Sequence, residues 1–198
     1  MLNRRKAIAT LLAKRGKDLF IVPGLGSTTY DVASLGDDER DFYLWGAMGG
    51  SVMIGLGVAL AQPKRKVAVI TGDGEMLMGI GSLATAGVQA PHNLAIVVFD
   101  NGQYGETGQQ ASHTHVSNTK AGVSLTGVAQ SCGIAETYEV ASEAELKALA
   151  DRLAHFDRTL FARVKIAAEE TPRVLPVRDG VALKHRFRRA MGVGEKGL

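Results

Sequence analysis

The sequence predicts an α/β fold: one doubly wound domain with a mainly parallel sheet of about six strands and helices on both faces. Two apolar runs, 67–71 and 97–99, carry this prediction, because continuously apolar, β-branched stretches are typical of strands buried on both faces of a parallel sheet. A third observation is the segment 79–90 between them, which has the character of a helix and ends before Pro91. Strand, helix and strand together form a right-handed βαβ unit.

Length and composition agree with one domain over residues 1–198. The chain has 45% hydrophobic and 22% charged residues, which are ordinary values for a folded globular protein. Its formal charge of +3 is small and dispersed, so nucleic acid is not an expected partner. The single Cys132 excludes a disulfide framework and a four-cysteine iron–sulfur site within the chain. There is no apolar run of 18 residues, and the basic start is not followed by a long apolar segment, so we expect no membrane contact and a cytoplasmic protein.

In the first half of the chain, helices and strands alternate as such a fold requires. The expected elements are a helix over 4–15 closed by Gly16, a strand over 18–22, a glycine-rich turn over 23–27, a short strand over 42–45 and a helix over 51–61. The first helix has Ile8, Leu11 and Leu12 on one face, which would pack on the sheet.

The second half completes the sheet. The expected elements are a helix over 124–132 ended by Gly133, a strand over 136–140, a helix from the capping box at 142–145 to about 155, and a last strand over 160–166. From about 172 the chain is a basic tail, irregular at first and helical from about 182.

Polar side chains follow the two apolar runs. Asp73 lies between Gly72 and Gly74 directly after the first run, and Asn101 follows the second. Ligands of such sheets bind beyond the carboxyl ends of the strands, so the two side chains should emerge together at that edge. Carboxylate and amide oxygens suit a divalent cation that is also bound to a diphosphate, and glycines let backbone N–H groups approach the phosphate oxygens. An Asp between two glycines is more often only a turn, so the pattern gains its force from the strand, helix and Asn that follow.

This pattern resembles the diphosphate-binding motif of thiamine-diphosphate enzymes, which is Gly-Asp-Gly followed after about one βαβ repeat by Asn. The resemblance implies that Asp73, Asn101 and the backbone carbonyl of Gln103 hold Mg²⁺. It also places Gly72, Gly74, Glu75 and Tyr104 among the residues that bind the cofactor. Many members of the family read Asn-Asn where this chain has Asp100-Asn101, and the second position, the usual ligand, is kept.

A second segment, Gly46-Ala47-Met48-Gly49, is similar to one that the same enzymes carry one βαβ unit earlier. The resemblance implies that the Gly46 carbonyl accepts a hydrogen bond from the aminopyrimidine and that Met48 holds the cofactor in its bent shape, which would make Met48 a catalytic residue. The competing interpretation is a small-residue turn with a core methionine. A dinucleotide fingerprint at 79–84 is weak, because it does not directly follow a strand.

The polar stretch 102–115 is too poor in apolar residues to form core, and loops beside a cofactor turn commonly carry function. It resembles the corresponding loop of sulfopyruvate and phosphonopyruvate decarboxylases, although Gln109 stands where those enzymes usually have glycine. We expect this loop to close over the substrate, with His113 or His115 as a catalytic group facing an anionic substrate. For each histidine taken alone, a free surface position is the safer interpretation.

The resemblance extends over nearly the whole chain and implies a subunit of a thiamine-diphosphate- and Mg²⁺-dependent decarboxylase of a small anionic 2-oxo acid, closest to the β subunit of sulfopyruvate or phosphonopyruvate decarboxylase. A separate α subunit with the pyrimidine-binding domain would supply the catalytic glutamate, in a higher oligomer of αβ pairs. Three alternatives stay open: a carboligase subunit of the acetolactate-synthase type, an oxo-acid:ferredoxin oxidoreductase β subunit, and a non-catalytic cofactor-binding domain.

Overall fold

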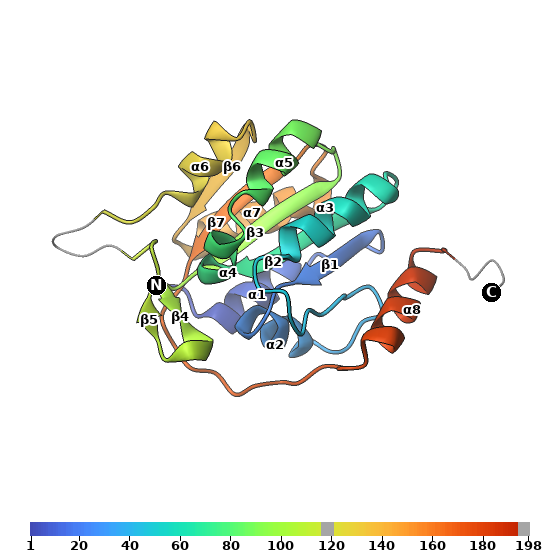
Figure 1. Ribbon diagram of the computed structural model, residues 1–198, viewed down its shortest axis with the longest axis horizontal. Helices are drawn as coiled ribbons and strands as arrows, with labels where there is room; N and C mark the ends of the chain where they lie inside the picture. The colour runs from blue at the N-terminus through green and yellow to red at the C-terminus, as the bar shows by residue number, and fades with distance from the viewer. Residues whose placement is uncertain (116–120, 194–198) are drawn as a thin grey trace.

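A five-stranded parallel sheet forms the centre of the molecule in the computed structural model, which describes residues 1–115 and 121–193 (Figure 1). Its strands, in spatial order, are β1 (Leu19–Pro23), β2 (Lys66–Gly72), β3 (Leu94–Asp100), β7 (Leu160–Lys165) and β6 (Glu136–Val140). All four pairings are parallel, and the three central strands β2, β3 and β7 are almost entirely buried. The parallel α/β prediction is therefore confirmed.

The predicted strand over 42–45 is wrong. Asp41, just before that segment, forms an isolated bridge with Ile21, and residues 42–45 belong to no strand, so the main sheet has five strands where about six were expected. Aromatic side chains of this loop pack into the core: Tyr43 is 2% exposed and belongs to the core cluster on one face of the sheet. Burial of aromatic side chains explains the apolar pattern there without any strand pairing.

Helices cover both faces of the sheet, as the doubly wound class requires. They are α1 (Arg4–Leu12), α2 (Ser27–Ala33), α3 (Ser51–Ala61), α4 (Asp73–Met78), α5 (Ser82–Gln89), α6 (Leu125–Ser131), α7 (Glu143–His155) and α8 (Gly180–Ala190). One core cluster joins α1, α2 and α7 to one face, and a second joins α3, α4, α5 and α6 to the other. Among the described residues, no helix is long and apolar enough to cross a membrane.

Two local differences from the predicted elements concern the ligand-facing edge. The helix expected over 79–90 is α5, which begins only at Ser82, and a further helix that was not predicted, α4, begins at Asp73 itself; a turn that contains Gly79 and Gly81 separates the two. The polar stretch 102–115 contains a small antiparallel hairpin of β4 (Gln103–Tyr104) and β5 (Gln110–Ala111), joined through the 3₁₀ turn η1 (Gly105–Thr107).

The C-terminal segment runs as a strap from the carboxyl edge of the sheet, past the hairpin and α2, to α8 at the opposite end of the molecule (Figure 1). Asp179 caps α8 by accepting hydrogen bonds from two N–H groups of its first turn. Phe187 of α8 packs against Phe20 and Phe42, with ring centroids 5.5 and 5.2 Å apart, which attaches the helix to the β1 edge.

Candidate cofactor site at the carboxyl edge of the sheet

A cavity of about 350 Å³ opens beyond the carboxyl ends of β1, β2 and β3. The chain leaves β1 towards one face, through α2, and leaves β2 towards the other, through α4, so a crevice between the two strands results. Eight residues that the sequence singled out line this cavity: Met48, Gly72, Asp73, Gly74, Glu75, Asn101, Gln103 and Tyr104. Gly46, His113 and His115 are not among the residues that line it.

Asp73 is the buried carboxylate of the site. It is 2% exposed, at the first position of α4, and β2 and β3 pair so that Gly72 lies opposite Phe99. Asp73 therefore emerges beside Asp100 and Asn101. Burial is the main cause that raises the pKa of Asp73 to about 6, and the nearby charge of Asp100 raises it further. Hydroxyl groups of Ser112 and Thr114 contact its Oδ2 atom at 2.5 and 3.2 Å.

Asp100 has a different role from Asp73, because its charge is compensated. Arg163 of β7 lies 2.6 Å from one carboxylate oxygen, and the other accepts hydrogen bonds from the Thr114 hydroxyl and the Gly102 N–H. Within the described part of the chain, no cation pairs with Asp73. A buried carboxylate without a cationic partner is costly, so Asp73 is the group that a bound cation would neutralise.

Asn101 and Gln103 come from the turn that follows β3. The Asn101 side-chain oxygen accepts from the Gln103 N–H at 3.0 Å, which closes a tight turn, and Gly102 in this turn has φ of +71°, a conformation that favours glycine. Both residues line the cavity.

Glu75 connects the turn after β2 to the turn after β1. One oxygen accepts hydrogen bonds from the Leu25 N–H at 3.0 Å and the Thr71 hydroxyl at 2.8 Å, and the other is buried without a partner among the described residues. A Cβ on Gly24 would lie 1.8 Å from this carboxylate, so glycine there permits the contact. On the other side of the turn, a Cβ on Gly74 would lie 2.6 Å from the Tyr104 ring, so the hairpin can lie against the start of α4.

Met48 reaches the cavity from a turn held in place by a contact between two glycines. Met48 is 38% exposed, and Ala47 before it has φ of +57°, which is unusual for a residue with a side chain. A Cβ on Gly79 would lie 2.1 Å from the Gly49 carbonyl oxygen, so only glycine allows this approach of the turn to the end of α4. Gly46 is exposed, and a Cβ at this position would meet no atom within 4 Å.

The polar loop directs its hydroxyl residues inwards and its histidines outwards. Ser112 and Thr114 are 5% and 3% exposed, whereas His113 and His115 are exposed. No group of three His, Cys, Asp or Glu residues that could hold a metal occurs in the described ranges. The catalytic role predicted for the histidines therefore stays a prediction, and the two hydroxyl residues beside them were missed. Their alternation in Ser-His-Thr-His was the available signal.

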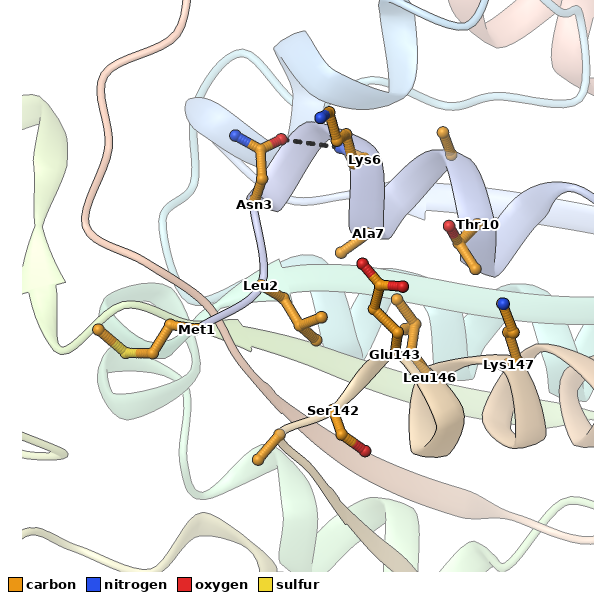
Figure 2. Close-up of a pocket in the computed structure, with 12 residues that line it drawn as sticks. Met1, Leu2, Asn3, Lys6, Ala7, Thr10, Ser142, Glu143, Leu146 and Lys147 are labelled. Atoms are coloured by element: carbon orange, nitrogen blue, oxygen red, sulfur yellow. Dashed lines mark hydrogen bonds between the residues drawn. The ribbon is translucent and has the colours of Figure 1, made fainter.

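A larger hollow of about 760 Å³ lies elsewhere, between the first turns of α1 and α7 (Figure 2). Asn3, Lys6 and Thr10 line it from one side, and Glu143 and Lys147 of α7 line it from the other. None of the residues that the motifs singled out lines this hollow, so size alone does not identify the site.

The fold and the cavity define a class: an α/β domain that presents a carboxylate and an amide from neighbouring strand ends to a ligand. The sequence model described as thiamine pyrophosphate enzyme, C-terminal TPP binding domain, matches residues 26–164. The chain belongs to this family of thiamine-diphosphate-binding domains.

Several known proteins are similar to this chain in sequence. Phosphonopyruvate decarboxylase of Streptomyces viridochromogenes is 40% identical over 159 residues, which are 80% of this chain and 38% of that protein. The β subunit of sulfopyruvate decarboxylase from Methanothermobacter thermautotrophicus is 40% identical over 133 residues, 67% of this chain and 68% of that subunit. The corresponding subunit of Methanococcus maripaludis is 33% identical over 190 residues, 94% of this chain and 97% of that subunit. The chain thus spans well under half of the phosphonopyruvate decarboxylase and almost all of the Methanococcus maripaludis subunit.

Solved structures share the fold. Benzoylformate decarboxylase from Polynucleobacter necessarius superposes with a TM-score of 0.66 at 22% identity, covering 86% of this chain and 34% of that one. The 2-oxoglutarate:ferredoxin oxidoreductase from Magnetococcus marinus superposes with a TM-score of 0.68 at 15% identity, covering 93% of this chain and 73% of that one.

Proposed function

We propose that this chain is the diphosphate-binding part of a thiamine-diphosphate- and Mg²⁺-dependent decarboxylase that acts in the cytoplasm on a small anionic 2-oxo acid, of the sulfopyruvate or phosphonopyruvate kind. One observation carries the proposal: Asp73, buried and without a cation among the described residues, lines the same cavity as Asn101. The relatives named sulfopyruvate and phosphonopyruvate decarboxylase, at 33% to 40% identity, support the substrate class.

The residues of the cavity fit the cofactor and its metal. Asp73 offers a carboxylate oxygen, Asn101 an amide oxygen and Gln103 a backbone carbonyl, which is the hard-oxygen set that Mg²⁺ prefers when phosphates complete its shell. Gly72 before α4 and Gly74 in its first turn line the cavity without side chains of their own. The volume of about 350 Å³ lies within the usual range of ligand sites.

In the proposed reaction, bound thiamine diphosphate supplies the electron sink that loss of carbon dioxide from a 2-oxo acid requires. This chain contributes binding and orientation. Asp73, Asn101 and the backbone carbonyl of Gln103 would hold the metal that accompanies the diphosphate. Met48 supports the rings from the turn at the cavity mouth, and the 102–115 loop lies beside the mouth, where closure would exclude water. The catalytic glutamate comes from the pyrimidine-binding domain, on an α subunit or on another part of a longer chain, within an oligomer of αβ pairs.

Cofactor titration tests the site. Calorimetry with thiamine diphosphate and Mg²⁺ should show a loss of affinity for Asp73→Ala that exceeds about 100-fold, because removing a ligand costs more than removing one of its outer partners. Asn101→Ala removes a neutral donor and should cost less. Unchanged affinity in Asp73→Ala would remove the metal assignment.

Turnover with the candidate pyrimidine-domain subunit tests the reaction. Release of carbon dioxide from sulfopyruvate or phosphonopyruvate, with an aldehyde as product, is the expected result. A coupled product from two 2-oxo acids would indicate a carboligase, and tight cofactor binding without any turnover would indicate a non-catalytic domain.

A further inference from the structure

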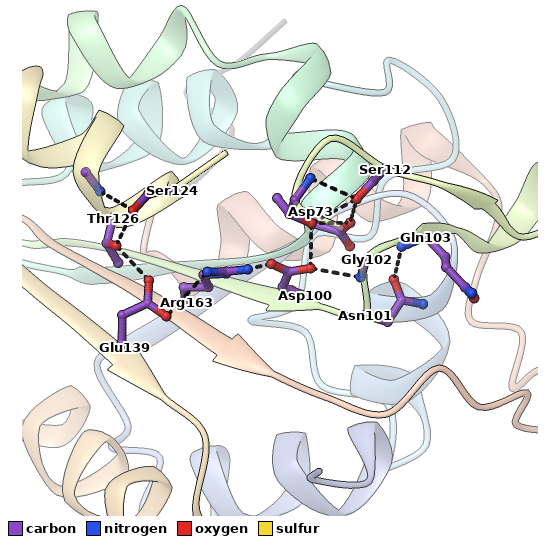
Figure 3. A network of polar contacts seen from close by, with 12 residues as sticks. Asp73, Asp100, Asn101, Gly102, Gln103, Ser112, Ser124, Thr126, Glu139 and Arg163 are labelled. Carbon is purple, nitrogen blue, oxygen red and sulfur yellow. Dashed lines mark hydrogen bonds and ion pairs between the residues drawn. The ribbon is translucent and has the colours of Figure 1, made fainter. Parts of the chain in front are cut away.

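A chain of polar contacts extends from the proposed metal carboxylate into the sheet (Figure 3). It begins at Asp73, passes through the hydroxyls of Ser112 and Thr114 to Asp100, and continues to Arg163. From Arg163 it reaches Glu139, Thr126 and Ser124 at the start of α6. Ser112, Thr114, Asp73 and Asp100 are each at least 95% buried.

The two hydroxyls restrict how the Asp73 carboxylate can turn. Both contact the same oxygen, Oδ2, at 2.5 Å from Ser112 and 3.2 Å from Thr114, and the hydroxyls lie 2.8 Å from each other. A carboxylate with one oxygen held in this way keeps its other oxygen available for a ligand. Such outer partners orient metal ligands in many sites.

The ion pair between Asp100 and Arg163 holds Thr114 in place. Its hydroxyl lies 2.8 Å from Asp100 Oδ1, closer than to Asp73, and each hydroxyl has one proton to donate. Asp100 is fixed from its other side by Arg163, at 2.6 Å, whose side chain is 12% exposed. The Thr114 oxygen therefore has a defined place between the two carboxylates.

We propose that Ser112 and Thr114 are positioning residues that hold Asp73 in the orientation that binds the metal, and that the Asp100–Arg163 pair fixes Thr114 in turn. The inference rests on the proposed function, because it takes Asp73 as a metal ligand. It assigns a role to the hydroxyl side of the loop whose histidines point outwards. The contacts beyond Arg163, at Thr126 and Ser124, belong to the packing of α6 and are not part of the positioning unit.

The experiment compares isosteric substitutions in the full chain. Thr114→Val removes the hydroxyl and keeps the shape, Thr114→Ser keeps the hydroxyl, and Ser112→Ala removes the other donor. Thr126→Val is the matched control, since Thr126 is a buried threonine of the same contact chain that bonds to Glu139. Mg²⁺ affinity is measured by calorimetry at a fixed thiamine diphosphate concentration, and thermal unfolding is measured without metal.

Thr114→Val and Ser112→Ala should lower Mg²⁺ affinity about 10- to 100-fold, the usual effect of losing an outer partner. Thr114→Ser should restore most of it, and Thr126→Val should leave it unchanged. Equal affinity in Thr114→Val and the unmodified chain, or an equal loss in Thr126→Val, would overturn the inference. Asp73→Ala in the same titration separates the two levels: if it also has no effect, the metal site itself is wrong, and if it alone abolishes binding, only the positioning role is wrong.

Discussion

At the scale of single residues, Asp73 combines a buried charge with hydroxyl partners, and this has a consequence for stability. Its pKa in the folded protein is about 6, above the ordinary value of 3.8, because burial and the Asp100 charge oppose ionisation. Between these two values the folded protein holds a proton that the unfolded chain releases, so stability is lost as the pH rises from about 4 to about 6.

We therefore expect Asp73→Asn to be more stable than the unmodified chain at pH 7 without metal, by about 1–3 kcal/mol, and the difference to vanish near pH 4. Urea unfolding with a chelator at both pH values measures this. Addition of Mg²⁺ and thiamine diphosphate should stabilise only the unmodified chain. The same dependence on pH in both proteins would show that Asp73 is not the titrating group.

Met48 gives a kinetic prediction. Met48→Ala leaves the metal and diphosphate contacts in place but removes the side chain at the cavity mouth, so turnover with the partner should fall more than cofactor affinity. Leu35→Ala is the control, because Leu35 is similarly exposed, at 46%, does not line the cavity and lies outside α3 and α5. Full turnover in Met48→Ala would leave Met48 with a packing role only.

At the scale of elements, the contact between the Met48 turn and the end of α4 depends on glycine at both places. Gly79→Ala would put a Cβ within 2.1 Å of the Gly49 carbonyl, so the turn has to move away. We expect a lower unfolding temperature and a loss of turnover. Gly81→Ala, two residues later, meets no atom within 4 Å and should change neither property. Comparable effects of the two substitutions in thermal unfolding and in the decarboxylation assay would contradict this account.

How much of this structure the sequence could predict differs between elements. The buried strands β2 and β3 followed from their continuous apolar character, and α7 from its capping box, which the structure contains at Ser142 and Glu145. The helix α2 was not defined, because its sequence STTYDVA is rich in residues that favour helices weakly. Its Thr28 and Thr29 hydroxyls bond to the Gly24 carbonyl, which is a tertiary arrangement of the site rather than a helix signal.

The same limit applies to the site. Asp73 and Asn101 were predicted together because each follows a strand of one βαβ unit. The pairing of Asp100 with Arg163 depends on β7 lying beside β3, with Asp100 opposite Lys165. No local sequence pattern indicates that strand order. The inward direction of Ser112 and Thr114 likewise depends on the hairpin that precedes them.

At the scale of the whole molecule, two neighbouring helices on one face of the sheet carry no charge. Neither α3 (SVMIGLGVALA) nor α5 (SLATAGVQ) contains a charged residue, and the two helices pack side by side. Met53 and Leu60 on α3 and Val88 on α5 are 45%, 48% and 82% exposed. Met48 and Met78 extend this apolar surface to the cavity mouth. A partner that covers the cofactor would therefore meet an apolar surface on this side.

If the pyrimidine-domain subunit covers this surface, a charge placed on it should weaken assembly. Met53→Glu and Leu60→Glu should each lower the affinity between the subunits, because a buried unpaired charge is costly, while thermal unfolding of the isolated chain stays nearly unchanged. Val181→Glu on α8 is the control, an equally apolar and exposed position, at 61%, far from the cavity. Sedimentation of the mixed subunits measures the complex. Undiminished assembly in both α3 variants would place the interface elsewhere.

The last prediction is that this chain has no decarboxylase activity by itself. All the motif-bearing turns belong to the diphosphate side of the cofactor, and the described residues form one five-stranded sheet with two helix layers and a small hairpin, so we expect the pyrimidine-side glutamate from another domain. The cavity mouth is formed by exposed Met48 and Met78, at 38% and 61%, so a bound cofactor would have its pyrimidine end in water.

Addition of the purified pyrimidine-domain subunit to this chain, with Mg²⁺, thiamine diphosphate and the 2-oxo acid, should raise carbon dioxide release from background by at least about 100-fold, since proton transfer by a positioned group alone contributes that much. A partner variant that lacks the glutamate is the control, and it should bind this chain without restoring turnover. Robust decarboxylation by this chain alone, at a rate that the partner does not change, would contradict the division of the active site between two domains.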